Sequence, residues 1–179
     1  MALTVADLQD LEANLDNFQE ADLRSILGDL TETVTVGEKE IAQDDFMAFV
    51  RKVWPNFIHG KHHEKMAKQF ERVARGECKR LIINMPPRHT KSEFASYLLP
   101  AWFLGKFPEK KVIQTSHTAE LAVGFGRKVR NLVDSDVYKT VFPGVGLQAD
   151  SKAAGRWATN RSEEHTSELQ SQSTISYAV

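Results

Sequence analysis

Apolar residues recur every three or four positions along most of the chain, which is the spacing of one buried helix face. Shorter runs rich in Val, Ile and Leu lack this period and predict strands. We expect helices over residues 4–30, 44–54, 61–75, 93–105 (with a kink at Pro100) and 118–133, and strands over 81–85, 110–116 and 156–159.

The order of these elements predicts the fold class. Strands that alternate with helices favour an α/β fold with a mostly parallel sheet and a ligand at the carboxyl ends of its strands. The runs over 81–85 and 110–116 have apolar, β-branched centres, so we expect both strands to be buried.

A polar stretch separates the first helical region from the rest of the chain. Residues 31–43 are polar and contain one glycine, which indicates a linker. We therefore divide the chain into an acidic helical arm with its linker (residues 1–43) and a body (residues 44–160).

The net charge of −1 hides a strongly polarised chain. Residues 1–50 hold 12 Asp and Glu against 2 Lys and Arg, a net of −10, whereas residues 51–160 hold 20 Lys and Arg against 9 Asp and Glu, a net of +11. A basic body suits ligands that carry phosphate, such as a nucleotide or DNA. The alternative is that the acidic arm neutralises the body within one fold.

The most distinctive motif is P-P-R-H-T-K-S at residues 86–92. Its two prolines cannot donate to a sheet, so they end the strand over 81–85 before the next helix begins. Strand, turn, Lys-Ser and helix is the order of a phosphate-binding loop, in which backbone N–H groups and the lysine hold phosphate. The pattern G-x-x-x-x-G-K-[ST] has glycine where this chain has Met85 and Thr90, so a plain strand-to-helix turn is an open alternative.

This motif resembles the variant phosphate loop of phage terminase large subunits, the DNA-packaging motors of tailed phages, which usually reads P-P-R-H-G-K-S. Only Thr90 departs from it. The resemblance covers roughly Trp54 to Asn160. Its weaker matches are the strands before and after the loop, Gly126-Arg127-x-x-Arg130, Phe142-Pro143, and Asp150-Ser151 ahead of Arg156-Trp157.

The resemblance implies the N-terminal part of an ATPase domain with a truncated phosphate-loop NTPase fold, and ATP and Mg²⁺ as its ligands. It places Lys91 at the β- and γ-phosphates and Ser92 at the metal ion. Arg88 stands where the family carries an arginine that acts in cis on the γ-phosphate, so Arg88 and Lys91 are the catalytic candidates. The residues expected to line the nucleotide are Pro87, Arg88, His89, Thr90, Lys91, Ser92 and Glu93.

Other candidates come from the flanking helices. Terminases hold the adenine just before the first strand, so the resemblance makes Phe57, His59 and His62 candidates to flank the base. Arg127 and Arg130 lie one turn apart and are candidates for phosphate or DNA, with solvated surface arginines as the alternative.

The pair His62-His63 invites a metal site, and the pattern argues against it. Adjacent residues on a helix point to different sides, and no Cys or third His has ligand spacing. Ser92 is therefore the single residue expected to contact a metal ion.

Parts of such a motor are missing from residues 1–160. No apolar strand there ends in Asp-Glu, so the carboxylates that hold Mg²⁺ and activate water are not found, and neither is the family's nuclease domain with its two-metal site. We expect this chain to bind nucleotide weakly without turning over ATP or cutting DNA. For a full-length protein, the resemblance implies ATP-driven DNA translocation, endonuclease activity and a homo-oligomeric ring. Its implied partners are double-stranded DNA, the portal and the small terminase subunit.

Two other classes of protein stay open. One is another phosphate-loop enzyme, such as a helicase-like motor or a small-molecule kinase. The other is a non-catalytic DNA- or protein-binding module, in which residues 86–88 form only a turn and nucleotide leaves the thermal stability unchanged.

The last residues do not resemble the rest. Residues 161–179 back-translate into AGATCGGAAGAGCACACGTCT and onward, which resembles a common short-read sequencing adapter. We interpret them as translated adapter and expect the natural protein to continue past Asn160. The alternative is a polar, Ser-rich disordered tail.

The compartment is inferred from absences in the sequence. A single cysteine, Cys78, suits a reducing environment, and no apolar run reaches membrane-spanning length. We expect a soluble protein, which by the resemblance lies in the cytoplasm of an infected bacterial host.

Overall fold

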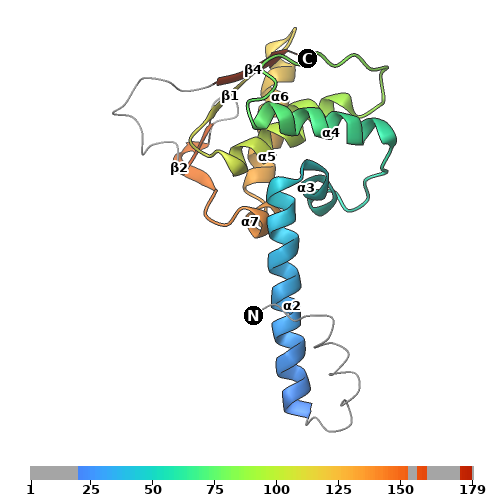
Figure 1. Cartoon of the computed structure of the whole chain (residues 1–179). Helices are drawn as coiled ribbons and strands as arrows, with labels where there is room; N and C mark the ends of the chain where they lie inside the picture. The colour runs from blue at the N-terminus through green and yellow to red at the C-terminus, as the bar shows by residue number, and fades with distance from the viewer. Residues whose placement is uncertain (1–19, 153–156, 161–173, 179) are drawn as a thin grey trace. The chain divides into compact units, whose positions relative to one another are not determined.

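The computed structural model describes residues 20–152, 157–160 and 174–178 (Figure 1). The start of the helix expected over 4–30 lies outside these residues. The described part is mostly helical, and its elements are α2 (Glu20–Asp44), α3 (Phe46–Val53), α4 (Lys61–Ala74), the π-helix η2 (Glu93–Leu98), α5 (Leu99–Lys106), β1 (Lys111–Thr115), α6 (Ala119–Val133), α7 (Asp136–Val141), β2 (Leu147–Lys152), β3 (Trp157–Thr159) and β4 (Thr174–Ala178).

The chain divides into two compact units, Met1–Glu40 and Ile41–Val179. The described part of the first unit belongs to α2, which continues without a break to Asp44. Residues 31–43 are therefore helical and not the irregular linker that we expected, and the boundary between the two compact units falls within them, after Glu40. One glycine, Gly37, costs a helix only about 1 kcal/mol, and the acidic and basic residues around it are good helix formers.

The core of the second unit is built from aromatic side chains of several helices. The Phe46 ring meets the rings of Phe70, Phe94 and Trp102 edge-to-face, with centroids 5.4, 5.7 and 5.5 Å apart. These residues come from α3, α4, η2 and α5, so one phenylalanine joins four helical segments. Edge-to-face pairs place the positive ring edge against the negative ring face, which favours this geometry.

Local interactions set the ends of these helices. The Asp45 carboxylate accepts a hydrogen bond from the Ala48 N–H (2.6 Å) at the start of α3, and the Thr118 hydroxyl accepts one from the Leu121 N–H (3.3 Å) at the start of α6. Gly76 follows α4 with a φ of 77°, the left-handed conformation that ends helices. The sequence analysis missed α7, which begins after the Ser135 cap.

The helix after the motif is irregular near Pro100. Proline supplies no N–H for the carbonyl four residues earlier, which is that of Ser96. The Ser96 carbonyl accepts instead from Gln114 Nε2 of β1, at 2.5 Å. The π-helical turn η2 ends at Leu98, two residues before Pro100, and α5 continues through the proline.

The strand expected over residues 81–85 is not formed. Leu81, Ile83 and Met85 pack against the core, while Ile82 is 86% exposed, so the segment keeps the alternation of a strand without pairing as one. In the part of the chain that the structure describes, β1 pairs with β4 and β2 with β3, and neither pair extends to this segment. A strand needs a neighbour for its backbone N–H and C=O groups, so an apolar run alone does not produce one.

Each sheet has two strands. β1 and β4 run parallel, with Lys111 opposite Thr174 and Thr115 opposite Ala178, and β2 and β3 run antiparallel. Ile113, at the centre of β1, is 52% exposed, so its expected burial is wrong. Along β1 exposed and half-buried residues alternate, so one face of the strand is covered and Ile113 lies on the open face. β4 falls within residues 161–179, which the sequence analysis interprets as translated adapter.

Within the described residues, no helix is long and apolar enough to cross a membrane.

Candidate functional site

Residues 86–92 form a tight turn that leads into a helix. Thr90 has a φ of 55° and Arg88 a φ of 64°. Helical structure begins at Lys91, and the Phe94 N–H donates to the Thr90 carbonyl at 2.9 Å, which closes the first turn. The first N–H groups of a helix have no carbonyl partner within it, so this turn presents donors that favour an anion.

The conformation of Thr90 is unusual for its residue type. A β-branched residue with a positive φ is an outlier, because its Cβ crowds the backbone. Thr90 stands at the position where the phosphate-loop pattern has its second glycine, a residue that takes a positive φ without strain. The backbone here therefore has the conformation of a glycine turn although the residue is threonine.

The expected nucleotide-lining residues differ in exposure. Pro87, Arg88 and His89 are exposed, and the His89 Nδ1–H donates to the Pro87 carbonyl at 3.0 Å. The four residues that follow are half-buried at the start of the helix: Thr90, Lys91, Ser92 and Glu93. The motif thus presents an exposed tip and a partly enclosed base.

A buried histidine contacts the base of the turn. His63 is 4% exposed, and its Nε2 lies 2.5 Å from Thr90 Oγ1. The Gly60 N–H donates to His63 Nδ1 at 3.0 Å, so Nδ1 is the acceptor and Nε2 carries the ring proton. The Thr90 hydroxyl donates in turn to the His89 carbonyl at 2.7 Å. A directed chain of three hydrogen bonds therefore runs from the start of α4 into the turn.

The local sequence explains how His63 is oriented. His63 is the third residue of α4, and its N–H donates back to the Gly60 carbonyl at 2.9 Å. This reciprocal pair resembles the capping box that a Glu or Gln at the same position makes. A Cβ on residue 60 would lie 2.9 Å from the His62 ring, so glycine at this position leaves room for the histidines.

Aromatic rings enclose His63 on the core side. Its ring lies 4.7 Å from that of Phe57 and 4.9 Å from that of Phe94. Burial in this environment, together with repulsion from the neighbouring His62 and His59, lowers the pKa of His63 to about 4. His63 is therefore neutral near pH 7.

The three adenine candidates lie around this histidine. Phe57 contacts His63, and His59 lies 6.5 Å from it, where it pairs with Glu64 at 3.3 Å. The rings of His62 and His63 are 3.8 Å apart, and the His62 ring is 5.7 Å from that of His89. The buried Nε2 of His62 has no hydrogen-bond partner among the described residues. The fold thus brings the segment over 57–63 beside the turn.

Helix α6 approaches the same region through Glu93. Lys128 of α6 pairs with the Glu93 carboxylate at 2.8 Å and lies over the rings of Tyr97 and Phe125. Sequence reasoning missed Lys128, because it had no signal that α6 packs beside the helix after the motif. Glu93 therefore holds two helices together at the edge of the candidate site.

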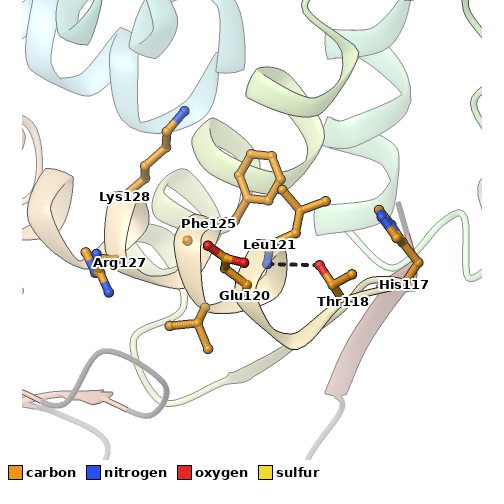
Figure 2. Close-up of a pocket in the computed structure, with 9 residues that line it drawn as sticks. His117, Thr118, Glu120, Leu121, Phe125, Arg127 and Lys128 are labelled. Atoms are coloured by element: carbon orange, nitrogen blue, oxygen red, sulfur yellow. Dashed lines mark hydrogen bonds between the residues drawn. The ribbon is translucent and has the colours of Figure 1, made fainter.

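The two arginine candidates of α6 lie in different surroundings. Arg127 lines an open pocket of about 590 Å³, with Lys128 beside it and His117 and Thr118 at the opposite end (Figure 2). Arg130 does not line this pocket and donates to the Asn131 side chain at 3.1 Å. Of the two, Arg127 has the better placement for an anionic ligand.

The residues present fit a phosphate better than a metal ion held by protein alone. In the described part of the chain, no group of three or more His, Cys, Asp or Glu side chains could hold a metal. Mg²⁺ bound together with phosphates needs few protein ligands, and the half-buried Ser92 hydroxyl is the available one.

Comparison of the chain with protein-family models, curated proteins and solved structures gave no significant match.

His63 is the main site residue to which sequence reasoning gave no role. It was considered only as a metal ligand beside His62. The available signal was its spacing, because His63, Met66, Ala67 and Phe70 recur at helical intervals and all four are buried. A polar residue on an apolar helix face needs a partner, and here the partner is the turn.

Proposed function

We propose that this chain is the ATP-binding part of a DNA-packaging motor of the phage terminase large-subunit type. The observation that carries the proposal is the left-handed backbone at Thr90, directly before Lys91 and the start of a helix. A plain strand-to-helix turn has no need for a strained threonine at the position of the motif's glycine. A phosphate-binding loop needs this geometry, because the backbone must approach the phosphates closely.

The proposed roles follow the resemblance to the terminase phosphate loop. Lys91 binds the β- and γ-phosphates, and Ser92 joins the Mg²⁺ shell. Arg88, on the exposed tip, acts on the γ-phosphate, and the segment over 57–63 borders the base. Bound Mg²⁺ neutralises phosphate charge, and the chain's own residues orient the nucleotide.

The wider role rests on the resemblance and on charge. Double-stranded DNA is the proposed substrate of the full-length motor, and the net charge of +11 over residues 51–160 suits it. A homo-oligomeric ring, the portal and the small terminase subunit are the proposed partners. The proposal includes no ATP turnover or DNA cleavage by the present chain, because residues 1–160 contain no strand ending in Asp-Glu.

Binding is tested by thermal unfolding of the full chain with and without Mg·ATP. A nucleotide at a hundredfold excess over its Kd stabilises the folded state by about 2.7 kcal/mol. We expect Lys91→Ala to abolish this stabilisation. Lys65→Ala, which removes an exposed lysine on α4, is the matched control and keeps it.

Three outcomes would count against the proposal. Equal stabilisation of wild type and Lys91→Ala would place the nucleotide elsewhere. No stabilisation of wild type, together with DNA binding that ignores nucleotide, would favour the non-catalytic module. Steady ATP hydrolysis that Lys91→Ala removes would show that the chain is a complete enzyme.

A further inference from the structure

The turn over residues 86–92 contains a threonine, Thr90, in a backbone conformation that is unfavourable for its residue type. Thr90 has a φ of 55°, and a threonine left to itself prefers a negative φ. Relaxation of this one torsion would reorient the N–H groups of Lys91 and Ser92, which are the donors that the helix start offers to a phosphate. Something outside the turn must hold it.

Among the described residues, His63 contacts Thr90 from outside the turn. Its Nε2–H donates to Thr90 Oγ1, and the Thr90 hydroxyl passes the interaction on to the His89 carbonyl. The His63 ring cannot turn away easily, because the Gly60 N–H donates to Nδ1 and the neighbouring rings of Phe57 and Phe94 both pack against it. The His63 ring is thus held in place beside the strained Thr90.

We propose that His63 is the positioning residue of the phosphate loop, whose neutral, Nε2-protonated imidazole holds Thr90 in the left-handed conformation that a glycine would take unaided. His63 does not touch the nucleotide and acts through Thr90. This role explains how the motif tolerates threonine at its glycine position. The consequence for nucleotide affinity rests on the proposed function, whereas the hold on Thr90 does not.

A cycle of variants tests the coupling, with the Kd for Mg·ATP measured by calorimetry on the full chain. Loss of one neutral hydrogen bond is expected to weaken binding about fivefold to tenfold in His63→Ala. Thr90→Gly should bind at least as tightly as wild type, because glycine needs no support at this φ. The double variant should match Thr90→Gly, so that His63 matters only when residue 90 is threonine.

A conservative variant separates positioning from packing. In His63→Gln, the side-chain oxygen can accept from the Gly60 N–H while the amide donates to Thr90 Oγ1, so Mg·ATP affinity should return to within about twofold of wild type. If His63 only filled space, His63→Ala would weaken binding equally with threonine or glycine at position 90, and glutamine would not rescue it. That result would overturn the proposal.

A measurement without nucleotide keeps this proposal distinct from the proposed function. Nitrogen-15 NMR of the imidazoles at pH 7 should show His63 protonated at Nε2 and not at Nδ1. On acidification, the backbone amide signal of Thr90 should shift over the same pH range as the imidazole nitrogen signals of His63. The other titratable groups facing His63 are His59, His62 and His89, with Glu64 paired to His59, so each is assigned separately.

The combined outcomes are decisive. The expected tautomer and a linked Thr90 signal without Mg·ATP binding would uphold the positioning role and refute the nucleotide site. If Mg·ATP binds but the effects of His63→Ala and Thr90→Gly on its Kd simply add, the nucleotide site would stand and the role of His63 would be refuted. The same conclusion would follow if Mg·ATP binds and His63 is protonated at Nδ1.

Discussion

Acid should destabilise this protein through His63 more than through an ordinary histidine. Burial lowers the pKa of His63 from 6.5 to about 4. At pH 7 the imidazole is mostly neutral in both the folded and the unfolded chain, so it causes little pH dependence there. Below pH 6.5 the unfolded chain takes up the proton first, and the folded chain follows only near pH 4.

The magnitude follows from the width of this window. Each unit of pKa difference corresponds to about 1.4 kcal/mol, so His63 should lower the free energy of unfolding by about 3 kcal/mol between pH 7 and pH 4. The loss accumulates across that range and levels off once both states are protonated. For a domain of this size, such a loss is a large fraction of the total stability.

Urea denaturation at half-unit steps from pH 7 to pH 4 measures the effect. Carboxylates also titrate in this range, so the informative quantity is the difference between wild type and His63→Gln, which keeps the hydrogen-bonding pattern without a titrating group. Between pH 7 and pH 4, the free energy of unfolding of wild type should fall by about 3 kcal/mol more than that of His63→Gln. His117→Gln, which removes an imidazole outside the cluster, controls for the loss of one histidine.

Parallel curves for wild type and His63→Gln would refute this reasoning. They would mean that His63 takes up its proton equally easily in the folded and the unfolded chain. The burial of its ring against Phe57 and Phe94 would then not govern its protonation.

Three further predictions concern the fold. Gly105→Ala should lower the free energy of unfolding, measured by urea denaturation, by about 1–3 kcal/mol, because its Cβ would collide with the buried Phe142 ring. Gly124→Ala should raise it by up to about 1 kcal/mol, because no atom of a neighbouring element lies within 4 Å of the new Cβ. Equal effects of the two substitutions would contradict this prediction. Tyr138→Phe should lower the free energy of unfolding, measured by thermal unfolding, by about 1 kcal/mol, because it removes the hydrogen bond from the Tyr138 hydroxyl to the Ala101 carbonyl (2.8 Å). Burial raises the pKa of Tyr138, so the hydroxyl stays protonated and remains a donor. An unchanged free energy of unfolding would show that this bond does not contribute. Deletion of residues 161–179 should change the free energy of unfolding by less than about 1 kcal/mol, because the buried core residues lie within residues 42–145 and a two-stranded sheet adds little stability. Loss of cooperative unfolding would mean that β4 is essential.

The candidate site was predictable in part. The motif over 86–92 carries its own signal, and the structure places a left-handed turn and a helix start there. The hydrogen bond between His63 and Thr90 was not predictable, because it joins residues 27 positions apart. The same is true of Lys128 and Glu93, which are 35 positions apart.

The sequence by itself determined the features that depend on neighbouring residues. Asp45 and Thr118 cap helices through N–H groups three positions away, and Gly76 ends α4 through its own backbone freedom. Such interactions close within one helical turn, so the pattern alone reveals them.

Only the tertiary structure decided the features that need a distant partner. The run over 81–85 has the composition of a strand, yet it forms none because its backbone has no neighbouring strand in the described chain. Ile113 is exposed for a different reason: it lies on the face of β1 that also carries the exposed Lys111 and Thr115, and burial of that face requires a second layer. The neutral state of His63 likewise arises from the rings and hydrogen-bonding groups that the fold assembles around it, because solvent exclusion is a property of packing and not of local sequence.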